Sequence, residues 1–384
     1  MPSLSSPQTI QVRPGARGWT HQPTRAGTED TVLAFHQTLT DYAETPLHSL
    51  PSLAAELGLS HVLVKDESCR FGLPAFKILG ASWAVYRAVG WHLGIPVADG
   101  QVSIAELAAK ARKAGVEIVT ATEGNCGRAV ARMAKLMELP VRVYVPSFMP
   151  ESTRELIRSE EAEVVEVEGS YDDLIPIVYE EGEDEDTILV LDVAFEGYTN
   201  FPKYFVQGYG TMLAEADKEV LEKTSRKPAT HAVVPCGAGS IAEAVTSHYK
   251  LSGRPHSSRA TVIAVEATAA PSLFESLKAG KIFSVQTSET IMAGMNCGTL
   301  STTAWPVLKA GIDASVLVDD KAAHEAVQEL EAAGLEAGPC GAASIAALRK
   351  ICADEKVKSE LGLDEESVVV CYCTEGTRDY PVPS

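Results

Sequence analysis

The feature that most constrains this fold is an alternation of short β-branched runs with segments of helical periodicity, which starts near residue 60. Amphipathic stretches such as 128–139, 151–162 and 321–334 separate most of these runs. Because a parallel strand pair needs a helical crossover, the alternation predicts parallel sheets covered by helices. Nine strands are many for one sheet, so we expect an α/β chain with two open, twisted, mostly parallel sheets. The nine predicted strands are residues 61–66, 117–122, 141–146, 162–169, 187–194, 231–237, 261–268, 314–320 and 367–376.

The charge balance bears on the partners of the chain. Its 33 Lys and Arg residues against 52 Asp and Glu give a net charge of −19, which argues against a nucleic-acid or anionic-membrane surface. No run approaches the roughly 18 apolar residues of a membrane span, and the N-terminal residues lack the apolar core of a signal peptide. The eight cysteines show neither a disulfide framework nor a zinc-site spacing. We therefore expect no metal and a reducing, cytoplasmic setting.

A glycine-rich turn follows the predicted strand 231–237, in "HAVVPCGAGSIAEAV". Gly237 and Gly239 permit close backbone approach, and the N–H groups of residues 237–241 would form an anion site at a helix N-terminus. One interpretation is a dinucleotide fingerprint, with Glu266 near the place of a ribose-binding acid. A second is a cup for one phosphate monoester, such as that of pyridoxal phosphate. A third is a strand-to-helix turn without a ligand.

Lys77 stands between apolar neighbours in "CRFGLPAFKILGA". It is either a lysine that extends from a half-buried helix to solvent or a buried lysine kept neutral, since desolvation lowers the pKa of a lysine. A neutral lysine and one phosphate cup are what pyridoxal phosphate requires. The dinucleotide interpretation leaves Lys77 unexplained, and its fingerprint usually opens a domain, whereas several βα units precede Gly237 here. We therefore favour pyridoxal phosphate.

Seven segments, in order from about residue 35 to the C-terminus, resemble the diaminopropionate ammonia-lyases, a family of fold type II pyridoxal-phosphate enzymes related to threonine and serine dehydratases. The resemblance implies a homodimer of two-domain subunits. The large, cofactor-binding domain would comprise residues 1–88 and 215–384, and the small domain residues 89–214. The segments are "KDESCRFGLPAFKILGASWA", "TEGNCGRAVA", "GSYDDL", "DVAFEGYTNFP", "CGAGSIAEA", "TIMAGMNCG" and "CTEGTRD".

The resemblance also implies which residues hold the cofactor. Lys77 would form the Schiff base, and Asn125 would hydrogen-bond the 3′-oxygen of the ring. Cys373, or Thr374 beside it, would be a neutral partner of the ring nitrogen. The phosphate cup would be formed by Gly237, Ala238, Gly239, Ser240 and Ile241.

Two acidic residues in loops after strands, Glu123 and Asp192, match family positions that act on the substrate, although acids also cap such turns. Thr122, in the same loop as Glu123, is likewise expected to bind the substrate. Tyr171 and Asp172, in "GSYDDL", match a segment near the substrate entrance, or alternatively form a helix N-cap box.

The implied reaction is β-elimination of 2,3-diaminopropionate or a close β-substituted amino acid, with the freed, neutral Lys77 as base at Cα. The product 2-aminoacrylate would give pyruvate and ammonia. Serine/threonine dehydration, β-replacement and a non-catalytic amino-acid sensor remain alternatives. The first two stay open because Glu123 replaces the family's aspartate and Cys126 its histidine, whereas the intact Lys77 argues against the sensor. Cys126 is a small packing residue or a reactive thiol at a helix N-terminus. For Cys297, we expect no disulfide.

Overall fold

The computed structural model describes residues 9–22, 28–122, 124–169, 171–254 and 259–383. The chain divides into two compact units, each with its own sheet. Unit 1 comprises residues 1–24, 45–68 and 215–384, and unit 2 comprises residues 25–44 and 69–214.

Unit 1 contains a seven-stranded sheet in the order β1-β10-β9-β8-β11-β3-β2. Its five inner strands are parallel, and the two short edge strands, β1 and β2, run antiparallel to their neighbours. All residues of β8, β10 and β11 are buried, as expected for parallel strands covered on both faces. The strands are β1 (Ile10–Val12), β2 (Leu47–Ser49), β3 (His61–Asp66), β8 (His231–Pro235), β9 (Thr261–Ala267), β10 (Ala314–Val318) and β11 (Val368–Cys373).

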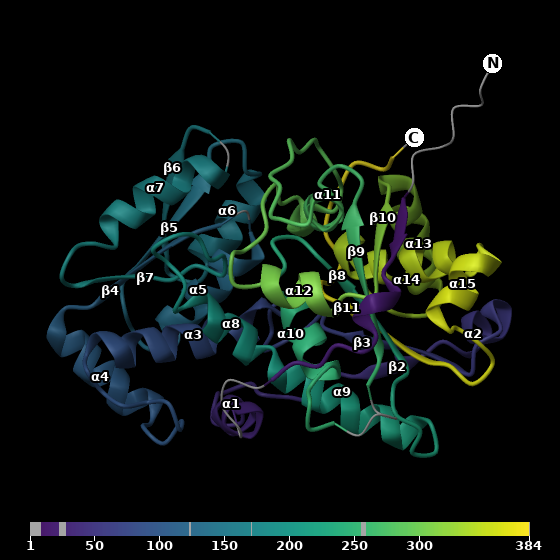
Figure 1. Ribbon diagram of the computed structural model, residues 1–384. Coiled ribbons are helices and arrows are strands. Elements are labelled where there is room, and N and C mark those ends of the chain that lie inside the picture. Colours follow the sequence, from purple (N-terminus) through teal and green to yellow (C-terminus); the bar gives the residue numbers. More distant parts are fainter. Residues whose placement is uncertain (1–8, 23–27, 123, 170, 255–258, 384) are drawn as a thin grey trace. The chain divides into compact units, whose positions relative to one another are not determined.

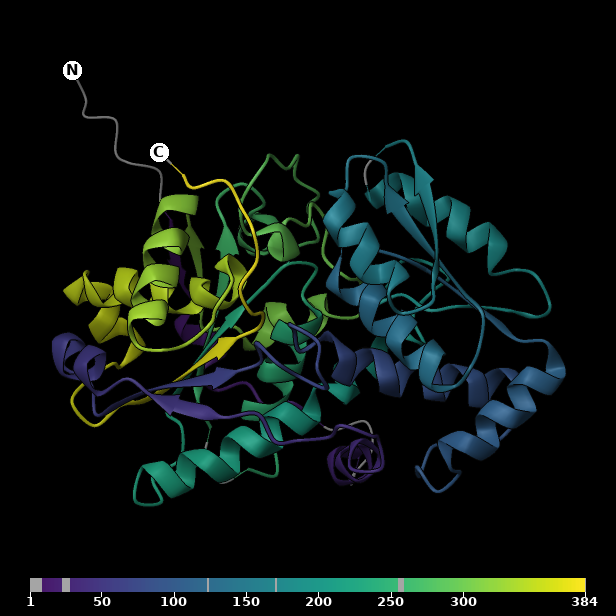
Figure 2. The ribbon, with the colours of Figure 1, turned by 180° about the vertical axis from the view of Figure 1, so that it is seen from behind.

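Helices cover both faces of this sheet. Helix α14 packs against β8, β9, β10 and β11 and carries α13 on its outer side, whereas α10 packs on β8 and β9 and is covered by α12. Figures 1 and 2 show these two pairs from opposite sides of the sheet. The helices of unit 1 are α2 (Pro51–Leu57), α10 (Ser240–Tyr249), α11 (Ser272–Ala279), α12 (Trp305–Gly311), α13 (Asp320–Ala332), α14 (Pro339–Cys352) and α15 (Glu355–Leu361), with short 3-10 turns at Pro14–Ala16 and Ala293–Met295.

Unit 2 contains a four-stranded, fully parallel sheet in the order β6-β5-β4-β7. Its strands are β4 (Glu117–Ala121), β5 (Val141–Pro146), β6 (Glu163–Val167) and β7 (Thr187–Leu189). Its helices are α1 (Thr28–His36), α3 (Lys77–His92), α4 (Ile104–Ala114), α5 (Asn125–Leu136), α6 (Glu151–Arg158), α7 (Tyr171–Glu181) and α8 (Pro202–Gly208), and α9 (Gly210–Lys223) contains the boundary between the units.

The predicted fold class is confirmed, and each of the nine predicted runs contains a strand. The division of the chain differs from the predicted one in two segments, because residues 25–44 and 69–88 pack with unit 2 rather than with the larger unit. The reason is α3, which packs on α5 and α8. At Gly80 the approach is so close that a Cβ atom would lie 2.6 Å from the ring of Tyr209.

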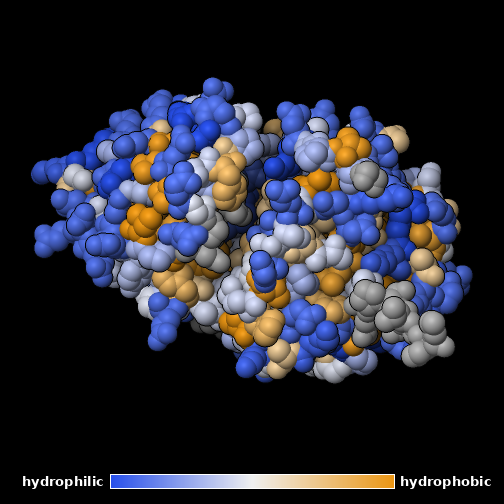
Figure 3. Space-filling view, turned by 90° about the horizontal axis from the view of Figure 1, so that it is seen from above, coloured by the Kyte–Doolittle hydropathy of each residue, from blue (hydrophilic) through white to orange (hydrophobic). Residues whose placement is uncertain are grey.

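The surface carries little continuous apolar area on the face shown in Figure 3, where hydrophilic residues predominate and hydrophobic residues form small separate patches. Exposed large side chains include Trp91 and Phe148, which are 67% and 69% exposed. Single exposed hydrophobic residues of this kind are normal for a globular protein. No helix in the described ranges has both the length and the apolar composition to cross a bilayer.

Substituting glutamine for His231 should reduce the acid sensitivity of the fold. Burial lowers the pKa of His231 to about 4, so between about pH 6.5 and 4 the unfolded chain binds a proton that the folded chain does not. Stability is therefore lost as pH falls through this window, by up to about 3 kcal/mol. Glutamine can keep the bonds to Thr230 and to the carbonyl of Leu361. Urea unfolding at pH 7 and pH 4.5 should show a smaller pH difference for the variant, and an equal difference would contradict this assignment.

Candidate active site

Lys77 lies at the start of α3 and is paired with a carboxylate. Its Nζ donates a hydrogen bond to Oδ2 of Asp192 at 2.6 Å, and the two side chains are 21% and 11% exposed. Asp192 follows β7 and is 115 residues away in sequence. Unit 2 thus brings together two of the residues that the sequence assigned to catalysis.

The pairing with Asp192 decides the charge of Lys77. Burial alone would lower the pKa of this lysine, but the negative charge of Asp192 and its hydrogen bond outweigh burial and hold the pKa well above the usual value. The expectation that apolar neighbours keep Lys77 neutral is therefore wrong for the cofactor-free chain. Here Lys77 is an ammonium group beside a carboxylate.

Cys126, in the first turn of α5, belongs to the same cluster. It is only 9% exposed. Burial, the charge of Asp192 and a hydrogen bond to that carboxylate raise the pKa of the thiol well above its usual value, although the positive charge of Lys77 opposes them. The thiol therefore stays protonated. This favours Cys126 as a small packing residue over the alternative of a reactive thiolate.

The loop between β4 and α5 is shaped by Thr122. This residue is buried, and its Oγ1 accepts the backbone N–H groups of Gly124 and Gly127, each at 2.9 Å. Asn125, the first residue of α5, is half-buried. Glu123 lies outside the described residues. Because β4 and β7 are neighbouring parallel strands, Asn125 and Asp192 both follow the carboxyl edge of the same sheet, where ligands bind in open α/β folds.

Tyr198 supports Asp192, although the sequence did not single it out. It is 8% exposed, its hydroxyl donates to the carbonyl of Leu189 at 3.0 Å, and it accepts from the N–H of Leu191 at 2.9 Å. Burial raises the pKa of this phenol well above its usual value, so it remains a donor. These bonds fix the backbone just before Asp192. An aromatic residue in a loop after a predicted strand was the available signal.

The segment predicted near the substrate entrance is described only in part. Tyr171 is the first residue of α7, which agrees with a helix start at this point. The side chains of Tyr171 and Asp172 lie outside what the structure describes.

In unit 1, the glycine-rich loop joins β8 to α10. Gly239 has a φ of 102°, and a Cβ atom there would lie 2.8 Å from Leu308. A Cβ atom at Gly237 would lie 2.9 Å from the carbonyl oxygen of Gly294 and 3.0 Å from Sγ of Cys297. Both positions therefore need glycine. The residues of this loop, Gly237, Ala238, Gly239, Ser240 and Ile241, end in the first helical turn, whose N–H groups have no intrahelical acceptor.

Cys373 ends β11, the strand next to β8, so it lies at the same edge of the sheet as the glycine-rich loop. It is 1% exposed, and burial raises the pKa of its thiol well above the usual value. Thr374 follows it and is 4% exposed. Sγ of Cys373 lies 3.5 Å from the carbonyl oxygen of Glu375, to which the neutral thiol donates. All eight cysteines lie in the described ranges, and no two of them, Cys297 included, form a disulfide bond.

Glu266, the acid that the dinucleotide interpretation needs, is used otherwise. It is fully buried, and its carboxyl oxygens accept the N–H groups of Leu273 and Phe274 at 2.6 and 2.8 Å. It also accepts from the hydroxyl of Ser315 at 3.1 Å. Glu266 therefore caps the N-terminus of α11. Because it is buried and both of its oxygens are already hydrogen-bonded, it cannot bind a ribose.

Comparison with known proteins agrees with this geometry. Residues 38–375 match the family model described as pyridoxal-phosphate dependent enzyme. The chain is 32% identical to the diaminopropionate ammonia-lyase of Salmonella typhimurium strain LT2, over 90% of this chain and 88% of that protein. It is 29% identical to the enzyme of the same name from Escherichia coli strain K12, over 90% and 87%.

A solved structure extends the similarity to the fold. The crystal structure of the Escherichia coli diaminopropionate ammonia-lyase, in complex with an aminoacrylate–PLP azomethine reaction intermediate, superposes with a TM-score of 0.83. The two sequences are 26% identical, and the match covers 96% of this chain and 94% of that one. The chain therefore belongs to the family of pyridoxal-phosphate-dependent enzymes and, within it, to the group of the diaminopropionate ammonia-lyases.

Proposed function

We propose that this protein is a pyridoxal-phosphate-dependent ammonia-lyase that eliminates the β-amino group of 2,3-diaminopropionate, or of a close β-substituted amino acid. The product, 2-aminoacrylate, gives pyruvate and ammonia after hydrolysis. The observation that carries the proposal is the ion pair of Lys77 with Asp192, because this reaction needs a lysine and a carboxylate beside one another. The similarity to the Salmonella typhimurium ammonia-lyase across 90% of this chain supports the same activity.

The chain offers fitting residues for pyridoxal 5′-phosphate. In unit 1, the loop of Gly237 and Gly239 has no room for Cβ atoms, and its helical N–H groups suit a phosphate dianion. In unit 2, Lys77 would hold the cofactor covalently and Asn125 would donate to the ring 3′-oxygen. The neutral thiol of Cys373, or the hydroxyl of Thr374, would face the ring nitrogen. Unit 1 would then be the main cofactor-binding domain.

The bound cofactor supplies an electron sink for the pair of electrons left at Cα when its proton is removed. Lys77, displaced from the cofactor by the substrate amine, would accept the proton at Cα. It would have to be the neutral amine to do so. The uncharged thiol of Cys373 would leave the ring nitrogen unprotonated, which would favour expulsion of the β-group.

Asp192 gives the site its preference for a nitrogen leaving group. A carboxylate already 2.6 Å from an ammonium nitrogen can hold a substrate β-amine in its protonated form, which takes the electron pair of the breaking Cβ–N bond and leaves directly as neutral ammonia. A β-hydroxyl gains less, since it brings no charge to the carboxylate. Glu123 and Thr122, in the loop before Asn125, and Tyr171 remain proposed contacts of the substrate.

A substrate panel tests the proposal. Purified enzyme loaded with pyridoxal phosphate is given L- and D-2,3-diaminopropionate, L-serine and L-threonine, and 2-keto acid formation is followed. We expect turnover of diaminopropionate at a kcat/KM at least about 100-fold above that for serine, the value of one charge-assisted hydrogen bond. Faster turnover of serine or threonine would show a dehydratase. Consumption only in the presence of an added nucleophile would show β-replacement.

Replacing Gly239 by alanine should weaken cofactor binding about tenfold or more, because alanine is strained at a φ of 102° and its Cβ would meet Leu308. Gly334→Ala is a matched control, since Gly334 also has a positive φ, of 82°, with open space around it. Equilibrium titration with pyridoxal phosphate, followed by fluorescence, gives the dissociation constants. Equal affinities of the two variants would argue against a phosphate cup at this loop.

We propose a homodimer in the cytoplasm, with a small amino acid as its only other partner and with neither nucleic acid nor membrane bound. The family resemblance supports the dimer, and the net charge of −19 supports the absence of polyanionic partners. Light scattering at micromolar concentration should give the mass of two chains. The mass of a single chain would contradict the proposed dimer.

A further inference from the structure

The turn just before Lys77 has a strained backbone. Arg70 and Leu73 exchange two backbone hydrogen bonds, of 2.8 and 2.9 Å, and so close a two-residue hairpin over Phe71 and Gly72. Both central residues are left-handed, with φ of 51° and 70°. Such turns normally use Asn, Asp or Gly, because a bulky side chain is disfavoured in this conformation. Phe71 therefore needs outside contacts to hold it there.

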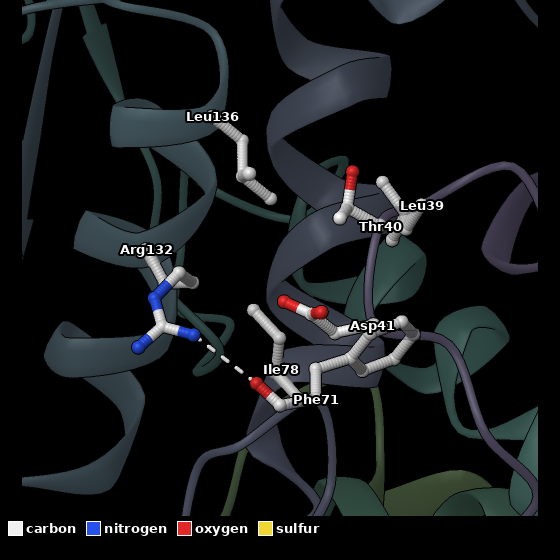
Figure 4. Close-up of a pocket in the computed structure, with 7 residues that line it drawn as sticks. All are labelled: Leu39, Thr40, Asp41, Phe71, Ile78, Arg132 and Leu136. Atoms are coloured by element: carbon white, nitrogen blue, oxygen red, sulfur yellow. Dashed lines mark hydrogen bonds between the residues drawn. The ribbon is translucent and has the colours of Figure 1, made fainter.

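Arg132 supplies one of these contacts. Its Nη1 donates to the carbonyl oxygen of Phe71 at 3.1 Å, and Figure 4 shows this bond between two residues that line a small cavity together with Asp41 and Ile78. Phe71 is 7% exposed, and its ring centroid lies 5.9 Å from that of Tyr42. The strained residue is thus held by its ring on one side and by its carbonyl on the other.

Glu160 fixes the direction of the Arg132 guanidinium. Nη2 of Arg132 donates to Oε1 of Glu160 at 2.8 Å, and Nε donates to Oε2 at 2.5 Å, so the pair is bidentate. Glu160 is 2% exposed and also accepts from Nε of Arg128 at 3.2 Å. With two of its nitrogens held by a buried carboxylate, the guanidinium turns its remaining nitrogen to Phe71.

Arg132 and Asn125 both lie on α5, seven residues or about two helical turns apart, and so on nearly the same face. Helix α5 therefore carries both Asn125, the proposed contact of the cofactor ring, and Arg132, which binds the turn that precedes Lys77. Only Pro74, Ala75 and Phe76 separate this turn from Lys77, and the ring of Phe76 is itself fixed 4.7 Å from that of Tyr209.

We propose that Arg132 is a positioning residue, which holds the Phe71 turn and thereby sets where Lys77 stands relative to Asn125 and Asp192. Arg132 touches neither the cofactor nor the substrate in this account. The inference rests on the proposed function in one respect, that Lys77 is the lysine that binds the cofactor.

Amide hydrogen exchange on the cofactor-free protein tests whether Arg132 stabilises the turn at Phe71. In Arg132→Met, the N–H groups of Arg70 and Leu73 should exchange about tenfold faster, as expected when a charge-assisted hydrogen bond that supports the turn is lost. Arg128→Met is the matched control, because it also removes a cation from Glu160 but leaves the carbonyl of Phe71 held. Unchanged exchange in Arg132→Met, or equal acceleration in both variants, would overturn the proposal.

Cofactor loading tests the consequence for Lys77. Borohydride trapping of pyridoxal phosphate on Lys77 should be about tenfold slower in Arg132→Met than in wild type and nearly unchanged in Arg128→Met. Arg132→Lys keeps a cation, but its single ammonium group cannot bind both Glu160 and the carbonyl of Phe71 as a guanidinium does. Its trapping rate should therefore lie between those of wild type and Arg132→Met. If Arg132→Met does not fold, this variant is the test. Trapping at the wild-type rate in Arg132→Lys would then overturn the proposal. Wild-type protein that traps no cofactor on Lys77 would instead refute the proposed function. The exchange data would still show whether Arg132 stabilises the turn at Phe71.

Discussion

Replacing Lys77 by alanine should abolish turnover, with a loss of about 1,000-fold or more in kcat. The substitution removes the amine that would hold the cofactor and the base that would move the proton at Cα. It also leaves Asp192 without the cation that lies 2.6 Å away in the structure. Wild-type protein loaded with pyridoxal phosphate should absorb at about 410–420 nm, the usual sign of a protonated Schiff base with lysine. The variant should lack this band.

Peptide mass spectrometry after borohydride reduction locates the attachment point. The reduced cofactor should be found on the peptide that contains Lys77. The peptide that contains Lys65 is the control and should carry no reduced cofactor. This lysine is also buried, but it is held in ion pairs by Glu215 at 3.2 Å and by Glu219 at 2.7 Å. A yellow, reducible adduct that survives in Lys77→Ala would refute the cofactor assignment.

Replacing Asp192 by asparagine should lower kcat/KM for diaminopropionate about 100-fold, because the amide keeps the shape but loses the charge that holds the β-ammonium. For a substrate whose β-group leaves without protonation, such as β-chloroalanine, kcat/KM should fall about tenfold at most. The ratio of the two losses separates recognition of the leaving group from general damage to the site. Equal losses on both substrates would contradict the assigned role of Asp192.

The same variant should shift the pH dependence of cofactor loading. Only the neutral form of Lys77 attacks the cofactor aldehyde, and the charge of Asp192 holds the pKa of this lysine well above its usual value. Loading of the wild-type chain should therefore keep accelerating as pH rises through the alkaline range. In Asp192→Asn the pKa of Lys77 falls, so the rise should begin at lower pH. The rate of absorbance growth at about 410–420 nm, measured from pH 7 to pH 10, gives both profiles.

The sheets could be predicted from the sequence because buried parallel strands read as β-branched runs between helical segments. The edge strands β1 and β2 could not, since each has only three residues and pairs antiparallel, and the partner of β1 lies far along the chain. The predicted placement of residues 69–88 in the large domain failed for a similar reason. The packing of α3 on α8 depends on contacts between side chains far apart in sequence, such as Gly80 with Tyr209.

The candidate site divides in the same way. Lys77, Asn125 and the glycine-rich loop stand in local motifs, so their sequence neighbours reveal them. The charge of Lys77 depends on a partner 115 residues away, and the local apolar context pointed to the opposite protonation state. Arg132 leaves no local signature, since it acts on a backbone carbonyl, that of Phe71, whose left-handed conformation only the structure shows.

The most direct test of the central claim is the stoichiometry of the products. Elimination from 2,3-diaminopropionate followed by hydrolysis of 2-aminoacrylate must release two molecules of ammonia for each pyruvate. Ammonia and pyruvate are measured in parallel with the loaded wild-type enzyme and L-2,3-diaminopropionate, and with Lys77→Ala as the blank. We predict a ratio of two that is lost with Lys77→Ala. No pyruvate from diaminopropionate, with one ammonia per keto acid from serine or threonine instead, would contradict the account.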